Sequence, residues 1–518
     1  MIAGWTVLSL LGSFSLTPDH SPFDSFDSSG NHVVTFDDAD ADADADADTS
    51  NQVQVMVKES PIVIAYAVSF IKCGDKQTSS AGLVDASLIL RHSVHAISSR
   101  NPSSGSKYDY KMYAIVHRQA EECSLRLKNM GFEILVVDPP VQQSEIRGEH
   151  LKAHIHKEWC CGHDEFVKLF AYTLPEQVIV HVDIDYAFYK PMDHLFDAII
   201  YDKDSEVGIK ARNSLELERP GEKLPDKIGA FITRDWGQVA PGKFPPAYQA
   251  GFLVARRDPS IVTDVLEVIR EGNYTDGWGY GHGWGNSGHG GYVGAMAMQG
   301  LMAYFYDHVK PGNAVELNQC RHNHMGMDAL YRSHPNFTPG RVKKEYIGGC
   351  RNTLEYCEGK LLIGEYCTVL VRYCIFSQLT IILPHCIALH CNYIPIDCQV
   401  TEFDKIYSVH YTMCRKPWQC MAIGSKSGSL PGGGRGNAIP TDVVNIDHCY
   451  MLHRRWHELR ADFEKKLFSL TGDGMIFDST KGEYKTETFL GHCNEDGNIG
   501  YQQISGKEET FTRVHELY

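Results

Sequence analysis

The chain has 518 residues, of which 43% are hydrophobic and 22% charged, and its net charge is −16. This composition is typical of a globular protein with one large domain or two ordinary ones, and it excludes a wholly disordered or fibrous chain. Seven of the negative charges are aspartates of an Asp-Ala tract over residues 37–48, and without them the net charge is −9. No cluster of Lys and Arg stands out, so we expect no nucleic acid among the partners.

The N-terminal region has the pattern of a secreted or lumenal protein. Residues 1–16 are apolar and uncharged, as in a signal peptide or short signal anchor, although a buried helix would have the same pattern. Residues 17–58 contain too few large apolar groups to fold, which predicts a disordered acidic stem. Sixteen cysteines and the tripeptides Asn273-Tyr-Thr and Asn336-Phe-Thr favour an oxidising compartment. We expect the secretory pathway, either the Golgi lumen or secretion, with the N-terminus as a potential membrane anchor.

Strands and helices are predicted to alternate after the stem. Runs of β-branched and aromatic residues predict strands, and apolar residues at helical spacing predict helices. The expected order is strand 60–70, helix 82–97, strand 108–117, helix 120–131, strand 132–138, helix 164–174 and strand 177–185. This alternation predicts an α/β fold with a mixed, mostly parallel sheet flanked by helices. Such sheets bind ligands beyond the carboxyl ends of their strands.

The pattern continues with a helix at 191–199, a strand at 248–258 and a helix at 260–272. A glycine-rich run follows over residues 277–294, with nine glycines between aromatic and histidine residues. Two interpretations stay open for this run. It is either a long surface loop or a lid whose Trp278, Tyr280 and Trp284 stack on a ligand.

Residues 359–396 differ from their surroundings, because they are apolar and rich in cysteine without a clear amphipathic period. A transmembrane helix would be interrupted by Arg372 and Pro384. A retained intron is the other explanation, since the codons for residues 359–360 and 396–397 can contain splice donor and acceptor sequences. The predicted organisation is one catalytic domain over 59–470, with 359–396 as an atypical insert, and a C-terminal extension over 471–518.

Two carboxylates stand directly after the predicted strand in "VIVHVDIDYAFYKP". Side chains at i and i+2 of a strand share a face, so Asp183 and Asp185 can converge on one point. A divalent cation relieves the repulsion between two such anions, and oxygen ligands suit Mn²⁺ or Mg²⁺. These ions in turn hold substrate phosphates. A polar loop without a metal is the alternative.

Two stretches, "HVDIDYAFYKPMDHLFD" and the downstream "VHYTMCRKPWQC" (residues 409–420), stand far apart in the chain. Together they resemble the corresponding motifs of family 8 glycosyltransferases, the glycogenin-like group. The resemblance implies a GT-A type Rossmann-like fold and a retaining transfer from a UDP-sugar to an acceptor that is a glycan, protein or lipid. It also implies that Asp183, Asp185 and His410 bind Mn²⁺, with Mg²⁺ as the alternative ion. Lys416 would then contact the diphosphate, and Lys168 the nucleotide sugar.

The sequence departs from the family pattern at Met298, which stands where the family has an aspartate. Gln299, the next residue, matches the family and is a candidate catalytic residue. Residues 316–324 resemble the strand that follows in the family. The departure leaves a second interpretation, a catalytically impaired binding protein with a glycosyltransferase fold. A third, a metal-dependent phosphodiesterase, would take ligands from His282, His289 and residues 320–328.

Overall fold

The computed structural model describes residues 60–73, 77–158, 162–215, 223–235, 246–277, 279–326, 398, 401–412, 414, 416–420, 446–472, 489–493, 501–504 and 511–518. Pro61–Tyr518 forms one compact unit. The predicted signal segment and acidic stem, the atypical insert at 359–396, and the sequon at Asn336 lie outside the described residues, so the structure tests none of them.

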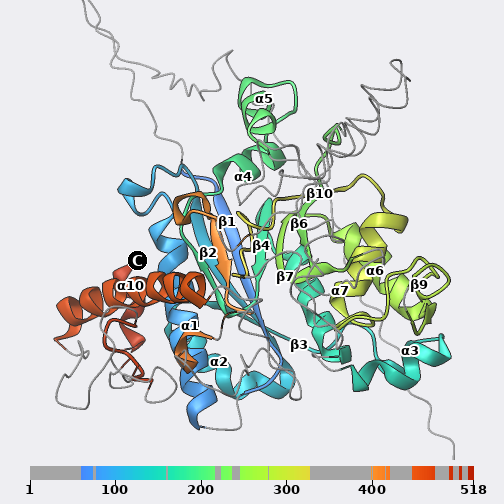
Figure 1. Cartoon of the computed structure of the whole chain (residues 1–518), viewed down its shortest axis with the longest axis horizontal. Coiled ribbons are helices and arrows are strands. Elements are labelled where there is room, and N and C mark those ends of the chain that lie inside the picture. Colours follow the sequence, from blue (N-terminus) through green and yellow to red (C-terminus); the bar gives the residue numbers. More distant parts are fainter. Residues whose placement is uncertain are drawn as a thin grey trace, which may run out of the picture. The chain divides into compact units, whose positions relative to one another are not determined.

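A seven-stranded sheet forms the centre of this unit (Figure 1). Six strands run in one direction, and only β7 runs antiparallel to its neighbours β4 and β6. The predicted mixed, mostly parallel α/β sheet is therefore confirmed. The strand order is β10 (Ala314–Glu316), β6 (Ala230–Arg234), β7 (Tyr248–Arg256), β4 (Val178–Val182), β1 (Val63–Phe70), β2 (Asp109–His117) and β3 (Glu133–Val137).

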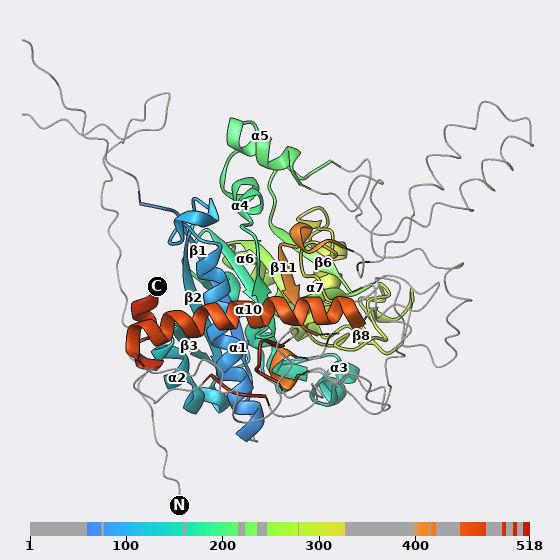
Figure 2. The ribbon, with the colours of Figure 1, turned by 60° about the vertical axis from the view of Figure 1, so that its left-hand side comes forward.

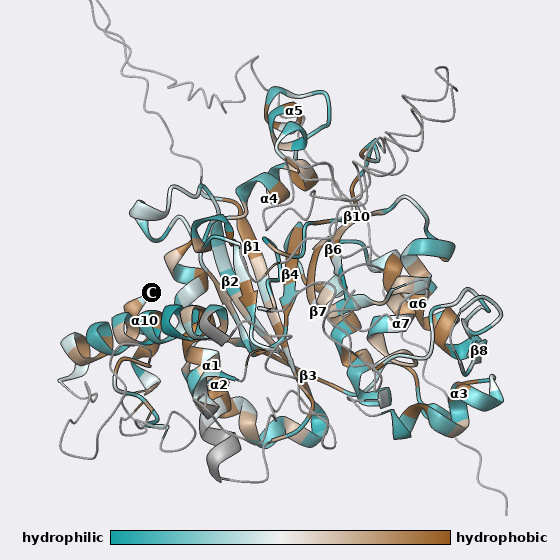
Figure 3. Ribbon diagram, viewed as in Figure 1, coloured by the Kyte–Doolittle hydropathy of each residue, from teal (hydrophilic) through white to brown (hydrophobic). Residues whose placement is uncertain are grey.

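Alternate side chains of each strand face opposite sides of the sheet. On one side, Ile64, Tyr66 and Val68 of β1 pack with residues of several helices in the largest apolar cluster. Among these helices are α1 (Gln77–Ala96), α2 (Ser124–Asn129), α4 (Asp193–Ile200) and α10 (Ile446–Thr471). Figure 2 shows α10 lying across α1, and Figure 3 shows hydrophobic residues gathered along the central strands.

On the other side of the sheet, Ala65 and Ala67 of β1 pack against the 3₁₀ helix η5 (Gly162–Thr173). Further along the sheet, the same side is covered by η5, α6 (Pro259–Glu271) and α7 (Met298–Tyr304). Both faces are thus buried, which explains why all five residues of β4 are buried and four of them are apolar.

Several short elements complete the fold. A separate two-stranded sheet pairs β5 (Tyr186–Phe188) with β11 (Ser408–His410), and β8 (Tyr274–Thr275) pairs with β9 (Gly283–Trp284). In the described residues, the remaining helices are α3 (Glu149–His154), α5 (Glu206–Asn213) and the π-helix η7 (Phe305–Val309). The 3₁₀ turns in this part of the chain are η1 (Pro102–Ser104), η2 (Arg118–Cys123), η3 (Gln143–Glu145), η4 (Ile155–Lys157), η10 (Phe403–Lys405), η11 (Pro417–Gln419) and η13 (Val514–Leu517).

The strand expected over residues 316–324 is wrong beyond Glu316, where β10 ends. Asn318 accepts a hydrogen bond at its side-chain oxygen from the Cys320 backbone N–H (2.8 Å), which turns the chain out of the sheet. Only His324, at the end of this stretch, forms an isolated bridge, and its partner is Val409.

Four disulfides join the described cysteines: Cys73–Cys123, Cys320–Cys398, Cys414–Cys449 and Cys420–Cys493. The described parts of the C-terminal extension pack into the largest apolar cluster through Phe489, Ile504 and Val514. None of the helices in the described part of the chain is long and apolar enough to span a bilayer.

Candidate functional site

The two aspartates stand where the central strand β4 leaves the sheet. All five residues of β4 are buried, and Asp183 follows directly, its backbone N–H donating to Gly251 O on β7 (3.2 Å). The chain then turns into β5, with Asp185 as the residue before that strand. The motif thus lies at the carboxyl end of the sheet, where open α/β sheets bind ligands.

His410 reaches the same point because β11 pairs antiparallel with β5. Tyr186 is opposite His410 in this pairing. The backbone on both sides of the histidine is fixed, since the His410 N–H donates to His324 O (2.9 Å) and the Tyr411 N–H donates to Asp185 O (2.8 Å). The imidazole therefore has a defined place beside the aspartates.

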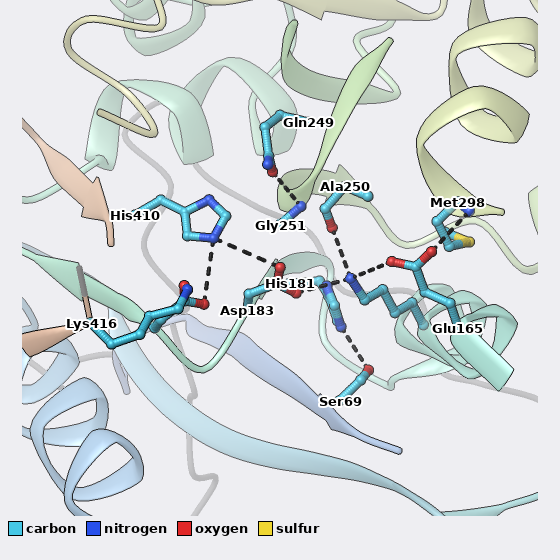
Figure 4. A network of polar contacts seen from close by, with 12 residues as sticks. Ser69, Glu165, His181, Asp183, Gln249, Ala250, Gly251, Met298, His410 and Lys416 are labelled. Atoms are coloured by element: carbon cyan, nitrogen blue, oxygen red, sulfur yellow. Dashed lines mark hydrogen bonds and ion pairs between the residues drawn. The ribbon is translucent and has the colours of Figure 1, made fainter. Parts of the chain in front are cut away.

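The three predicted metal ligands form one group, and Figure 4 labels two of them, Asp183 and His410. The His410 Nε2 atom lies 3.4 Å from Asp185 Oδ1 and 3.8 Å from Asp183 Oδ2, and all three ligand atoms are within 4.8 Å of one another. The side chains of His410 and Asp185 are 2% and 8% exposed, whereas that of Asp183 is 34% exposed. The group is closed on the protein side and open at Asp183, as a metal that also binds a substrate requires.

A glycine keeps space beside the group. A Cβ atom on Gly251 would lie 2.5 Å from His410 Cε1 and 2.7 Å from Asp183 Oδ2. Two carboxylate oxygens and one imidazole nitrogen are a donor set that suits Mn²⁺. The residues therefore fit a divalent metal in both ligand chemistry and space.

The ionisation states also suit a cation. Burial lowers the pKa of His410 to about 4, although Asp183 opposes this shift, so the imidazole is neutral near pH 7. Burial alone would raise the pKa of Asp183, but Lys168 and His410 outweigh it and lower that pKa to about 2. An anionic carboxylate and a neutral imidazole are the forms that bind metals.

Both predicted lysines lie at this group. Lys168, on η5, places its Nζ 2.9 Å from Asp183 Oδ1 and 3.4 Å from Ala250 O. Lys416, directly before η11, forms an ion pair with Asp185 Oδ2. The structure thus brings together Lys168, Asp183, Asp185, His410 and Lys416, as the motif spacing predicts.

Gln299, the candidate catalytic residue, is not brought into contact with the three ligands. Its amide donates to Val293 O (2.6 Å), and among the described residues it makes no hydrogen bond to them. The Met298 side chain, 5% exposed, packs in an apolar cluster. The backbone N–H of Met298 instead donates to Glu165 Oε2 (3.2 Å).

Glu165 is the main site residue that the sequence alone does not reveal. Its Oε1 lies 2.9 Å from Lys168 Nζ, so it belongs to the same polar network (Figure 4). Gln249 was also missed as a contributor, and its Oε1 accepts from the Gly251 N–H (2.6 Å). In the sequence, the contact of Glu165 with Lys168 is indicated only by their i,i+3 spacing, because residues three apart stack on one face of a 3₁₀ helix.

The glycine-rich run is not a simple lid. Trp284 is wholly buried, and its indole N–H donates to Ala295 O (2.8 Å). His289 is also buried and pairs with Asp307 (3.1 Å). Neither side chain can stack on a ligand from solvent, whereas Tyr280 is 82% exposed. Trp278 lies outside the described residues.

No protein-family model and no curated protein matches the chain. Among solved structures it is similar to apo mouse xyloside xylosyltransferase 1 (10% identity, TM-score 0.27, covering 51% of this chain and 87% of that one). It is also similar to the galactosyltransferase LgtC in complex with donor and acceptor sugar analogs (10%, TM-score 0.31, covering 77% and 96%). The match to the bifunctional glycosyltransferase WbbM (11%, TM-score 0.33) covers 78% of this chain but only 52% of that one. At these identities and TM-scores, likeness carries no conclusion about activity.

Proposed function

We propose that this chain is a metal-dependent glycosyltransferase that takes a sugar from a UDP-sugar donor. The observation that carries the proposal is the convergence of Asp183, Asp185 and His410, with Lys168 and Lys416 against the same carboxylates. Acid and histidine ligands with adjacent lysines at the carboxyl end of a parallel sheet suit a diphosphate held through a metal.

The charges at the site support a diphosphate ligand. Glu165, Asp183 and Asp185 carry three negative charges against the two positive charges of Lys168 and Lys416. The net charge of these groups is therefore −1, and a bound divalent ion would make it +1. An anionic ligand would then be attracted only after the metal has bound. When bound, Mn²⁺ would supply Lewis-acid stabilisation of the departing diphosphate.

This chain's own residues would perform the remaining roles. Asp183, Asp185 and His410 would hold the ion, and Lys416 would place a point charge on the diphosphate. Lys168 would approach the nucleotide sugar from the η5 side. We propose retention at the transferred sugar, with an acceptor that is a glycan, protein or lipid.

Calorimetric titration of UDP with and without Mn²⁺ tests the proposal. We expect UDP binding that depends on Mn²⁺ and is lost with a chelator, followed by UDP release when UDP-sugars are screened as donors. If UDP does not bind in the presence of Mn²⁺ or Mg²⁺, the proposed function is wrong.

A catalytically impaired binding protein is the second candidate, and the buried, non-ionisable Met298 side chain favours it. Metal-dependent UDP binding without hydrolysis or transfer of any UDP-sugar would support that function. The phosphodiesterase alternative needs more clustered ligands, and in the described part of the chain His282, His289, His322 and His324 belong to no metal-binding group.

We also propose that the protein works in the secretory pathway, in the Golgi lumen or outside the cell. The support is four disulfides among the described cysteines, since such bonds persist in oxidising compartments.

A further inference from the structure

Both oxygens of the buried Glu165 carboxylate connect it to the site. It lies on η5 together with Lys168, and residues three apart on a 3₁₀ helix stack on one face. Glu165 is 3% exposed and Lys168 7% exposed, with 2.9 Å between Glu165 Oε1 and Lys168 Nζ. Burying a carboxylate is costly unless it is paired and hydrogen-bonded, so this contact decides whether Glu165 is tolerated there.

The second oxygen of Glu165 fixes a different segment. Glu165 Oε2 accepts from the backbone N–H of Met298, the first residue of α7, across 133 residues of sequence. The residue before α7, Ala297, supplies no side-chain cap. Glu165 therefore satisfies a helix N–H that would otherwise be buried without a partner.

The ammonium group of Lys168 has three donors, and their directions fix where its charge lies. Glu165 Oε1 and Asp183 Oδ1 each lie 2.9 Å from Nζ, and Ala250 O lies 3.4 Å away. Without Glu165, the ammonium group would lose the anchor opposite Asp183. Its place beside the metal group would then be less defined.

We propose that Glu165 is a positioning residue, which holds Lys168 against Asp183 and ties that lysine to the start of α7. This role rests on the proposed function, because it assumes that Lys168 contacts the donor. Glu165 also supplies a negative charge next to the uncharged Met298 at the start of α7, although Glu165 itself lies on η5.

The chain offers a matched control in Glu158. Its two oxygens accept from the N–H groups of Gly294 (3.1 Å) and Met296 (3.2 Å), in the turn that leads into α7. Glu158 thus fixes the same segment as Glu165, but among the described residues it forms no ion pair with Lys168. A comparison of the two variants separates an effect through Lys168 from an effect through α7.

The experiment is a double-mutant cycle on UDP affinity in the presence of Mn²⁺, with E165Q, K168M and both substitutions together. We expect E165Q alone to weaken UDP binding about tenfold, the size of one hydrogen bond to a charged group. In the K168M background the same substitution should change affinity by less than about twofold, because the two residues act as one unit. E158Q should stay within about twofold of the wild-type protein, since it leaves Lys168 unchanged.

Additive losses in the cycle, or an equal loss in E158Q, would overturn the positioning role and leave Glu165 as a structural residue of α7. If E165Q does not fold, E165D replaces it in the cycle. It keeps the charge but is too short to serve both contacts, so we expect a smaller loss that again disappears with K168M. Absence of UDP binding in the wild-type protein would instead refute the proposed function itself.

Discussion

Asp185 and His410 lie side by side because of a pairing that is very distant in sequence. Tyr186 follows Asp185 and Ser408 stands two residues before His410, and their hydroxyl groups hydrogen bond at 2.8 Å across 222 residues of chain. This buried bond and the strand pairing set the register, and a shift of one residue would turn His410 to the opposite face of the strand. The site is therefore defined by backbone pairing as much as by its side chains.

Replacement of Asp185 by alanine should abolish Mn²⁺-dependent UDP binding. The change removes a metal ligand and the ion pair between Asp185 and Lys416. Calorimetry on folded protein is the measurement, and D276A is the control, because Asp276 is exposed directly after β8 and belongs to no metal-binding group. Binding that is unchanged in D185A would remove the metal assignment.

Gly251 should be intolerant of even a methyl group. A Cβ atom there would come within 2.5 Å of His410 Cε1, a distance at which atoms must move apart. We expect G251A to fold but to bind Mn²⁺ and UDP at least about tenfold more weakly, as when ligands are displaced by a fraction of an ångström. G312A is the control, since a Cβ on Gly312 meets no atom within 4 Å and any effect comes from its φ of +79°. Equal binding by G251A and wild type would contradict the proposed cradle.

Five residues of the site could be predicted from the sequence, and two, Glu165 and Gln249, could not. Asp183, Asp185, His410 and Lys416 belong to the two motifs that resemble family 8 glycosyltransferases, and Lys168 follows from the same resemblance. Glu165 contacts the site through a 3₁₀ turn and through a backbone N–H, and neither has a residue pattern of its own. The buried state of Trp284 was equally hidden, because an aromatic residue between glycines has no period from which burial can be inferred.

Among the elements, helix α1 contacts both α10 and residues 501–504. Asp85 on α1 accepts hydrogen bonds at Oδ2 from the Tyr501 hydroxyl (2.8 Å) and the Ile504 N–H (3.0 Å), and it lies 3.8 Å from Arg460 of α10. Burial raises the pKa of Asp85 to about 6, against the opposing effects of Arg460 and these hydrogen bonds. One carboxylate thus joins three separate segments.

D85A should lower the free energy of unfolding by about 2 kcal/mol, since buried donors lose their acceptor and Arg460 loses a nearby carboxylate. Urea unfolding measures this change, and UDP binding should be unaffected. D138A is the control, because Asp138 forms an exposed, solvent-screened pair with Arg118 that we expect to contribute little to stability. An equal loss in the two variants would show that Asp85 does not anchor the C-terminal region.

Long elements were predictable and short ones were not. β1, β2 and α6 lie close to their expected bounds, because each has enough residues to show a period. β4 ends at Val182, three residues before the expected end at 185, so Asp183 and Asp185 follow the strand instead of lying in it. β5 and β11 have three residues each, too few to show any alternation. Their pairing is nevertheless what brings His410 to the aspartates.

At the scale of the whole molecule, buried neutral histidines make the fold sensitive to acid. Burial lowers the pKa of His194 and His448 to about 4 each, and that of His492 to about 2. The unfolded chain, with histidine pKa values near 6.5, therefore takes up these protons first as the pH falls.

The contribution of these histidines to stability should be complete above about pH 6.5 and decline towards pH 4, by about 1.4 kcal/mol per pH unit for each residue. Asp85 has the opposite effect on stability, because its raised pKa lets the folded protein bind a proton there before the unfolded chain does. This offsets part of the loss of stability below pH 6. Urea unfolding at pH 7.5 and pH 5 measures the difference. A free energy of unfolding that does not change between these two values would contradict the prediction.

The secretory location predicts a glycan at Asn273, whose side chain is exposed at the residue before β8. Protein made in a secretory host should lose mass on digestion with an endoglycosidase, and N273Q should not. T275S is the matched control, since serine preserves the acceptor tripeptide while T275A destroys it. Secreted protein without any sugar at Asn273 would count against this site.

The disulfide Cys320–Cys398 has a consequence for the integrity of the chain. It connects residues on the two sides of the stretch 327–397, and the other three described disulfides each lie wholly on one side. A protease cut anywhere in that stretch would leave two fragments, with Asp183 on one and His410 on the other. The nicked protein should run as one band until a reductant is added, and both halves of the metal group would stay covalently attached.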